Sequence, residues 1–295
     1  MTLRQEMLDA ASRAPVLLGG TSEAVATFLR RQQCPDGGFR GRGEHSDLYY
    51  TVFAVEGLIA LLGALPALDP IRRYIESFGP GEAVDFVHLA CLARCWADVG
   101  GPGPAPGVCA AIRRRIEGHR AGDGGYSPTP GAEHGTAYGC FLALGALEDL
   151  GAEDVDKGAI LRCLAALQRG DGGYANERPL RASTTPATAA AVSIAKHMTG
   201  TADKAAVGFL LARAAADGGF CATAAAPFPD LLSTATALHA LAGLTRHSPD
   251  LARSCTRFVE GLRADAGGYR GVWLDDAPDP EYTFYALLAL GHLQG

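Results

Sequence analysis

The segment QQCPDGGFRGRGEHSDLYYT, residues 32–51, places many polar side chains directly before an almost uncharged apolar stretch. Asp47 and Tyr50 lie near its end, and His88 and His134 lie at a similar level in the next two segments of the chain. Carboxylates and imidazoles act as acids or bases, and histidine changes its charge near neutral pH. We therefore take these four residues as the candidate catalytic groups.

Side chains of the metal-ligand type gather in the same three segments. They are His45, Asp47, Asp85, His88 and His134. Imidazole and carboxylate ligands suit Zn, Fe or Mn, so a divalent metal is one interpretation. Capping is the other, because polar side chains are common at helix N-termini for that reason alone.

The chain repeats one short pattern, Asp-Gly-Gly followed by an aromatic residue. It begins at Asp36, Asp123, Asp171 and Asp217, and a variant, AGGY, begins at Ala266. The last three steps are 48, 46 and 49 residues, and the first step of 87 residues is nearly two periods. A fixed period of this size predicts stacked copies of one supersecondary unit, and we count six.

Each unit predicts two helices joined by the glycine turn. The helix before the turn is amphipathic and charged, whereas the helix after it is apolar or small on every side and is therefore buried. Their small residues also leave room for a cavity of several hundred Å³. No segment alternates with period two, so we expect little or no sheet. We expect the buried helices to begin near Asp47, Val84, Glu133, Thr185, Leu231 and Pro280.

Composition narrows the class of protein. The chain has 295 residues, is 48% hydrophobic and carries a formal net charge of −6, which argues against nucleic acid as a partner. Its eight cysteines have no CxxC spacing and predict reduced, buried thiols. We find neither a signal peptide nor a stretch long enough to span a membrane, and we expect a cytoplasmic protein.

Two of the turns carry a more specific pattern. Residues 33–39 and 168–174 both read Gln-x-x-x-Gly-x-aromatic. This resembles the repeats of the superfamily of prenyltransferase β-subunits and squalene–terpene cyclases. The resemblance implies an all-α fold, an α/α toroid in which six buried helices surround a central cavity and six amphipathic helices encircle them. We expect one domain over 1–295, with a helical extension over 1–20 and repeats of roughly 46 residues from 21.

The first loop resembles a functional loop of that family. In protein prenyltransferase β-subunits a GGF-x-G-R loop supplies arginine to the isoprenoid diphosphate, and GGFRGRG places Arg42 there with Arg40 beside it. A guanidinium pairs well with phosphate oxygens. We expect Tyr49 and Tyr282 to contribute to the wall of the substrate site. The alternative is that both arginines belong to a solvated rim.

The zinc ligands of the family match poorly. β-subunits place Asp four residues and Cys two residues before the Thr of a buried helix, and His one residue before it in the following unit. The corresponding residues are Asp230, Leu232 and Tyr282, so only Asp230 matches. This argues against a zinc-dependent protein prenyltransferase, which activates a thiol.

The resemblance implies a prenyltransferase-like or terpenoid-cyclase-like enzyme with an isoprenoid or another hydrophobic small molecule in its lumen. An anionic head group would then lie near Arg40 and Arg42. The Asp-x-Asp-Asp acid of cyclases is not matched by Asp275, Asp276 and Asp279. A non-catalytic toroid stays open as the alternative, either a binding module for hydrophobic ligands or the β-like subunit of a heterodimer with an α-subunit-like protein.

Overall fold

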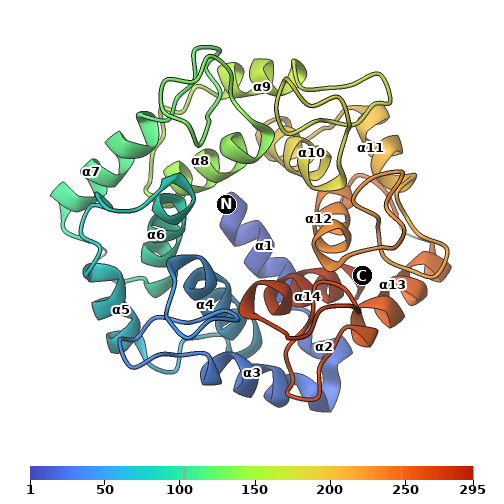
Figure 1. Cartoon of the computed structure of the whole chain (residues 1–295), viewed down its shortest axis with the longest axis horizontal. Helices are drawn as coiled ribbons and strands as arrows, with labels where there is room; N and C mark the ends of the chain where they lie inside the picture. Colours follow the sequence, from blue (N-terminus) through green and yellow to red (C-terminus); the bar gives the residue numbers. More distant parts are fainter. Residues whose placement is uncertain (102–103, 247, 295) are drawn as a thin grey trace.

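The computed structural model describes residues 1–101, 104–246 and 248–294. Its helices form two concentric rings (Figure 1). In the described ranges the inner ring consists of α4 (Leu48–Leu62), α6 (Phe86–Val99), α8 (Ala137–Asp149), α10 (Thr185–Thr199), α12 (Leu231–Leu241) and α14 (Pro280–Leu293). The outer ring consists of α3 (Ser22–Arg31), α5 (Leu68–Glu76), α7 (Pro106–Glu117), α9 (Lys157–Ala165), α11 (Lys204–Leu211) and α13 (Pro249–Gly261).

The rings confirm the predicted α/α toroid. Each inner helix packs against the next one, and α14 packs against α4 to close the ring. Within the described ranges, β pairing is limited to isolated bridges, most of them around the glycine turns. No helix in the described part of the chain combines the length and apolar character needed to cross a bilayer.

The inner helices begin where side chains cap them. Asp47 caps α4 by accepting from the Tyr49 amide at 2.6 Å, and α10, α12 and α14 begin at the expected residues. The expected start at Val84 was two residues early. The expected start at Glu133 was four residues early, because the Glu133 carbonyl still pairs with the turn that contains Asp123.

In four of the units, one threonine ties the glycine turn to the inner helix that follows it. The Phe39 amide donates to Thr51 Oγ1 at 2.9 Å, and that hydroxyl donates to the Asp47 carbonyl at 2.7 Å. The same pair of hydrogen bonds recurs at three further threonines: Thr188, Thr234 and Thr283. The glycines are required as well, since a Cβ on Gly37 (φ 98°) would lie 2.0 Å from the Pro70 carbonyl oxygen.

The N-terminal segment places its first helix at the centre of the ring (Figure 1). It contains α1 (Leu3–Ala11), α2 (Pro15–Leu18) and a 3-10 turn, η1 (Gly19–Thr21), and α1 lies inside the lumen (Figure 1). α1 contacts α14, α4 and α8, and its Leu3 and Met7 are buried. We call the end of the lumen at α1 the floor, and the end at the N-termini of the inner helices the mouth.

Candidate active site

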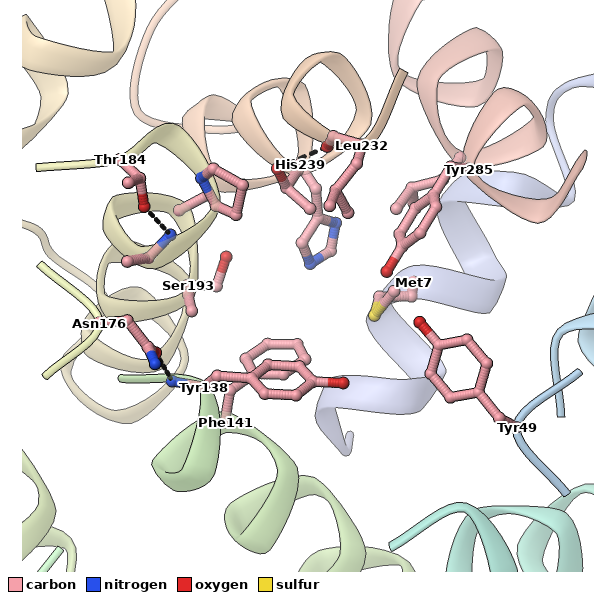
Figure 2. Close-up of a pocket in the computed structure, with 16 residues that line it drawn as sticks. Met7, Tyr49, Tyr138, Phe141, Asn176, Thr184, Ser193, Leu232, His239 and Tyr285 are labelled. Carbon is pink, nitrogen blue, oxygen red and sulfur yellow. Dashed lines mark hydrogen bonds between the residues drawn. The ribbon is translucent and has the colours of Figure 1, made fainter. Parts of the chain in front are cut away.

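A cavity of about 430 Å³ lies in the lumen above α1. Figure 2 shows its wall, which comes mainly from α8, α10, α12 and α14, with Tyr49 of α4 and Met7 of α1. α10 contributes small side chains, including Ala187, Ala190 and Ser193, and these create the space. The cavity is mostly apolar with a few polar groups, as is typical of sites for small hydrophobic molecules.

Three tyrosines surround this cavity: Tyr49, Tyr138 and Tyr285 (Figure 2). Burial raises the pKa of Tyr49 and of Tyr285 well above the ordinary value for tyrosine, so both phenols stay neutral and can donate hydrogen bonds. Tyr49 and Tyr285 also pack against Phe53, with ring centroids 5.0 and 5.5 Å from its own. Together they make an electron-rich aromatic wall beside the cavity.

A carboxyl group lies at the mouth beside the first of these tyrosines. The Tyr49 hydroxyl donates to Glu281 Oε1 at 2.7 Å. Burial raises the pKa of Glu281, while the hydrogen bond from Tyr49 lowers it in part. Glu281 follows its cap, Asp279, by two residues, as Tyr49 follows Asp47. The ring therefore places both at one level.

A histidine lies deeper in the cavity. His239 of α12 is only 5% exposed, and its imidazole points into the cavity in Figure 2. Its Nδ1 lies 3.0 Å from Nε2 of His292, and its Nε2 has no hydrogen-bond partner. Burial, together with His292 and the ammonium of Lys196, lowers the pKa of His239 well below its ordinary value. The imidazole is therefore neutral.

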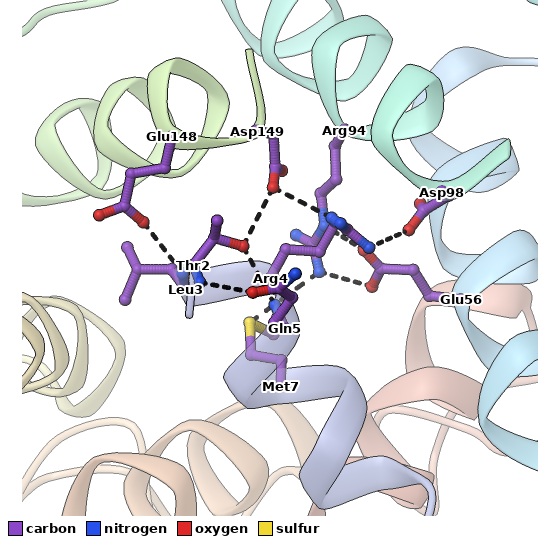
Figure 3. A network of polar contacts seen from close by, with 10 residues as sticks. All are labelled: Thr2, Leu3, Arg4, Gln5, Met7, Glu56, Arg94, Asp98, Glu148 and Asp149. Carbon is purple, nitrogen blue, oxygen red and sulfur yellow. Dashed lines mark hydrogen bonds and ion pairs between the residues drawn. The ribbon is translucent and has the colours of Figure 1, made fainter. Parts of the chain in front are cut away.

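Paired charges hold α1 in place at the floor (Figure 3). Arg4 of α1 binds Asp98 at 2.8 Å and Asp149 at 3.0 Å, and Arg94 pairs with the fully buried Glu56. Carboxylates around Arg94 outweigh its burial and raise its pKa, so it stays charged. A second cavity of about 60 Å³ lies between this network and the tyrosines.

Two of the sequence-predicted catalytic residues meet at the mouth. His88 Nε2 lies 3.3 Å from the Asp47 carboxylate, and His88 Nδ1 lies 2.8 Å from Asp85. Burial opposes the charging of His88, but the two carboxylates outweigh it and raise its pKa. Both ring nitrogens are engaged, and none of the three residues lines the cavity.

The predicted head-group arginine is already paired. Arg42 binds Asp279 at 3.0 Å and Asp275 at 3.1 Å, and its guanidinium lies 5.7 Å from the ring centroid of Tyr282. Arg40 is exposed on the same loop. Tyr50 packs against this loop too, because a Cβ on Gly41 would overlap its ring. Arg42 thus joins the first and last units of the ring.

The remaining predicted residues stay apart from these groups. His134 lies 3.6 Å from Asp123 and 3.7 Å from Glu133, within its own loop, and His45 is exposed. Asp230 caps α12 through the backbone and hydroxyl of Ser233.

The described part of the chain therefore offers no set of ligands that fits a metal ion. No group of three or more His, Cys, Asp or Glu residues is arranged there to hold an ion. Asp230 is engaged in capping, and the neighbouring family positions hold Leu232 and Tyr282. We derive no chemical step through a metal.

The chain belongs to the prenyltransferase alpha-alpha toroid domain family, whose model matches residues 6–77, 108–227 and 230–295. No curated protein matches the sequence.

Several solved structures share the fold. The type II terpene cyclase MstE from Scytonema, in complex with geranylgeranyl dihydroxybenzoate, is 13% identical, with 99% of this chain and 98% of that chain covered and a TM-score of 0.64. An alpha-1,6-mannanase of Salegentibacter in complex with alpha-1,6-mannotriose is 13% identical (94% and 98% covered, TM-score 0.65). Candida albicans protein geranylgeranyltransferase-I, complexed with GGPP, is 11% identical (90% and 89% covered, TM-score 0.61). At these identities the likeness establishes the fold.

Glu281 and His239 are not among the site residues predicted from the sequence. Glu281 precedes Thr283 by two residues, as Tyr49 precedes Thr51, so aligning the repeats could have found it. His239 is an ionisable residue in an otherwise apolar stretch, which is an unusual place for a polar side chain. The position of α1 could not be predicted in this way, because no pattern in residues 3–11 indicates that they lie inside the ring.

Proposed function

We propose that this chain binds an isoprenoid-like hydrophobic molecule in its lumen and converts it by terpenoid-cyclase-like chemistry. The observation that carries the proposal is the 430 Å³ cavity, with its apolar wall and its tyrosines. Solved structures of the same fold agree with it, since MstE is a type II terpene cyclase with a geranylgeranyl-bearing substrate and geranylgeranyltransferase-I binds GGPP.

Charge favours cyclisation over prenyl transfer from a diphosphate. No arginine or lysine is among the described residues that line the 430 Å³ cavity. At the mouth, Arg42 is neutralised by Asp275 and Asp279, so a diphosphate would have to displace two carboxylates. A neutral polyene needs no such exchange, because its burial is driven by the apolar wall.

The proposed proton donor is Glu281, held by Tyr49. The raised pKa of Glu281 favours its acid form, which can protonate a terminal alkene carbon at the mouth. The π pair of the alkene forms the new C–H bond, the neighbouring carbon becomes a cation, and Glu281 is left as the carboxylate. The faces of Tyr285 and Phe141 stabilise the cation by cation–π attraction. Loss of a proton from the cyclised cation to the carboxylate restores the acid.

The test is turnover of polyprenyl probes in heavy water. Farnesol and geranylgeranyl dihydroxybenzoate should give cyclised products that contain deuterium at the protonated carbon. Glu281→Gln should lower turnover by about 100-fold or more while binding persists, because it removes the general acid. Glu44→Gln, on the exposed first loop, is the control and should leave turnover unchanged. Equal turnover in the two variants would overturn the role of Glu281.

A non-catalytic carrier is the second candidate. It is favoured by one observation, that no carboxylate is among the described residues lining the 430 Å³ cavity. A carrier would bind the same probes and release them unchanged. Intact probe after long incubation, with binding confirmed by native mass spectrometry, would select the carrier over the cyclase.

A further inference from the structure

We infer that the deep end of the cavity, beside His239 and Ser193, is a binding subsite for a hydroxyl group at the inner end of the ligand. The inference rests on the proposed binding of a hydrophobic molecule in the lumen. It adds the class of substrate, a polyprenyl chain or terpenoid that carries an alcohol or phenol. This end enters first, and the alkene end stays near Glu281 at the mouth.

One nitrogen in this largely apolar cavity is unpaired. Nε2 of His239 has no hydrogen-bond partner, and the residue is only 5% exposed. A buried polar atom without a partner destabilises the protein unless something satisfies it. Because the imidazole points into the cavity (Figure 2), a ligand can supply that partner.

Other polar groups face the same space from neighbouring helices. Ser193 of α10 is 3% exposed, and its hydroxyl points into the same cavity as the His239 ring (Figure 2). Thr236 of α12 also lines the cavity, and its hydroxyl donates to the Leu232 carbonyl at 2.7 Å, which leaves its oxygen able to accept. Two helices therefore present donors and acceptors to the same cavity.

The histidine pair explains why a hydroxyl fits best. If His239 Nδ1 carries the proton that it shares with His292, then Nε2 accepts; if His292 donates, then Nε2–H donates. A hydroxyl serves both arrangements, whereas a carbonyl or an ether serves only one. Charged groups fit poorly, since Lys196 already donates to the His239 carbonyl at 2.8 Å and no described lining residue of this cavity is charged at neutral pH.

The test compares two probes that differ by one atom. Farnesol and the hydrocarbon of the same skeleton without the hydroxyl are titrated into the full-length protein, and the dissociation constants are measured by calorimetry. We expect the wild type to prefer farnesol by about tenfold, the size of one buried hydrogen bond. His239→Phe should lose this preference and keep its affinity for the hydrocarbon. His45→Phe, at an exposed rim histidine, should keep the preference.

The possible negative results distinguish a failure of the hydroxyl subsite from a failure of ligand binding in the lumen. Equal affinity of the wild type for the two probes overturns the hydroxyl subsite and leaves lumen binding intact. A preference that survives in His239→Phe also overturns it, and His239→Leu, which likewise cannot form a hydrogen bond, gives the same comparison if the phenylalanine variant does not fold. Absence of binding by both probes overturns the lumen proposal together with the subsite. A farnesol-dependent shift of the His239 Nε2 resonance in 15N NMR of the wild type would support the subsite without any variant.

Discussion

Replacing Gly291 by alanine tests whether α1 belongs inside the ring. A Cβ on Gly291 of α14 would lie 1.8 Å from the Ala10 carbonyl oxygen, far short of the 3.4 Å at which ordinary contact begins. The obstacle is helix backbone, which cannot rotate away. Overpacking costs about 1–3 kcal/mol, and the better helix propensity of alanine returns about 1 kcal/mol. We therefore expect Gly291→Ala to lower the free energy of unfolding by up to about 2 kcal/mol.

Gly145→Ala is the matched control on another inner helix. Gly145 lies in α8, and a Cβ there meets nothing within 4 Å. The same substitution should raise the free energy of unfolding by up to about 1 kcal/mol, because only helix propensity changes. Urea denaturation and thermal melts measure both, and Gly291→Ala should lower Tm by up to about 8 °C. If both variants were stabilised alike, α1 would not pack on Gly291 as described.

Two further predictions concern the charges at the floor. Glu56→Gln should destabilise the protein by about 3–5 kcal/mol, because it leaves Arg94 buried without its partner. Replacing both residues by leucine should recover most of this loss, as measured by urea denaturation. An equal loss of stability in the double variant would contradict the reasoning. His197 binds Glu148 and Glu6 of α1 at 2.6 Å each, and these hydrogen bonds raise its pKa above the ordinary value of about 6.5. The contribution of His197 to stability is therefore complete below that value and is lost as the pH rises through the raised pKa. His197→Gln should remove this pH dependence from the free energy of unfolding. An unchanged dependence on pH in the variant would refute the role of His197.

The repeating turns made the fold predictable. A period that recurs from Asp123 to Ala266 reflects local chemistry, namely a left-handed glycine, a buried aromatic side chain and a helix cap. Each of these acts within one unit, so one sequence suffices to recognise it. The error at Glu133 has the same origin, because the third unit ties its turn with Cys140 Sγ, 3.4 Å from the Tyr126 amide, where four other units use threonine.

The candidate site was less accessible to the same reasoning. Tyr49 lines the cavity, and its predicted contact with a substrate stays a prediction. Arg42, by contrast, faces Asp275 and Asp279, more than two hundred residues away in the sequence, and this pairing exists only because the ring closes. The charge available to an anionic ligand thus depends on which units become neighbours.

The sequence alone determined the class of fold, the two layers of helices and the presence of a lumen, because periodicity and burial follow from residue types in order. Only the tertiary structure decided what the lumen contains. α1 enters it because Gly291 permits close contact and Arg4 meets Asp98 and Asp149 there. His239 faces the remaining space with one free nitrogen, since ring geometry directs that face of α12 inward. Such contacts join residues distant in the chain, and their spacing leaves no local pattern.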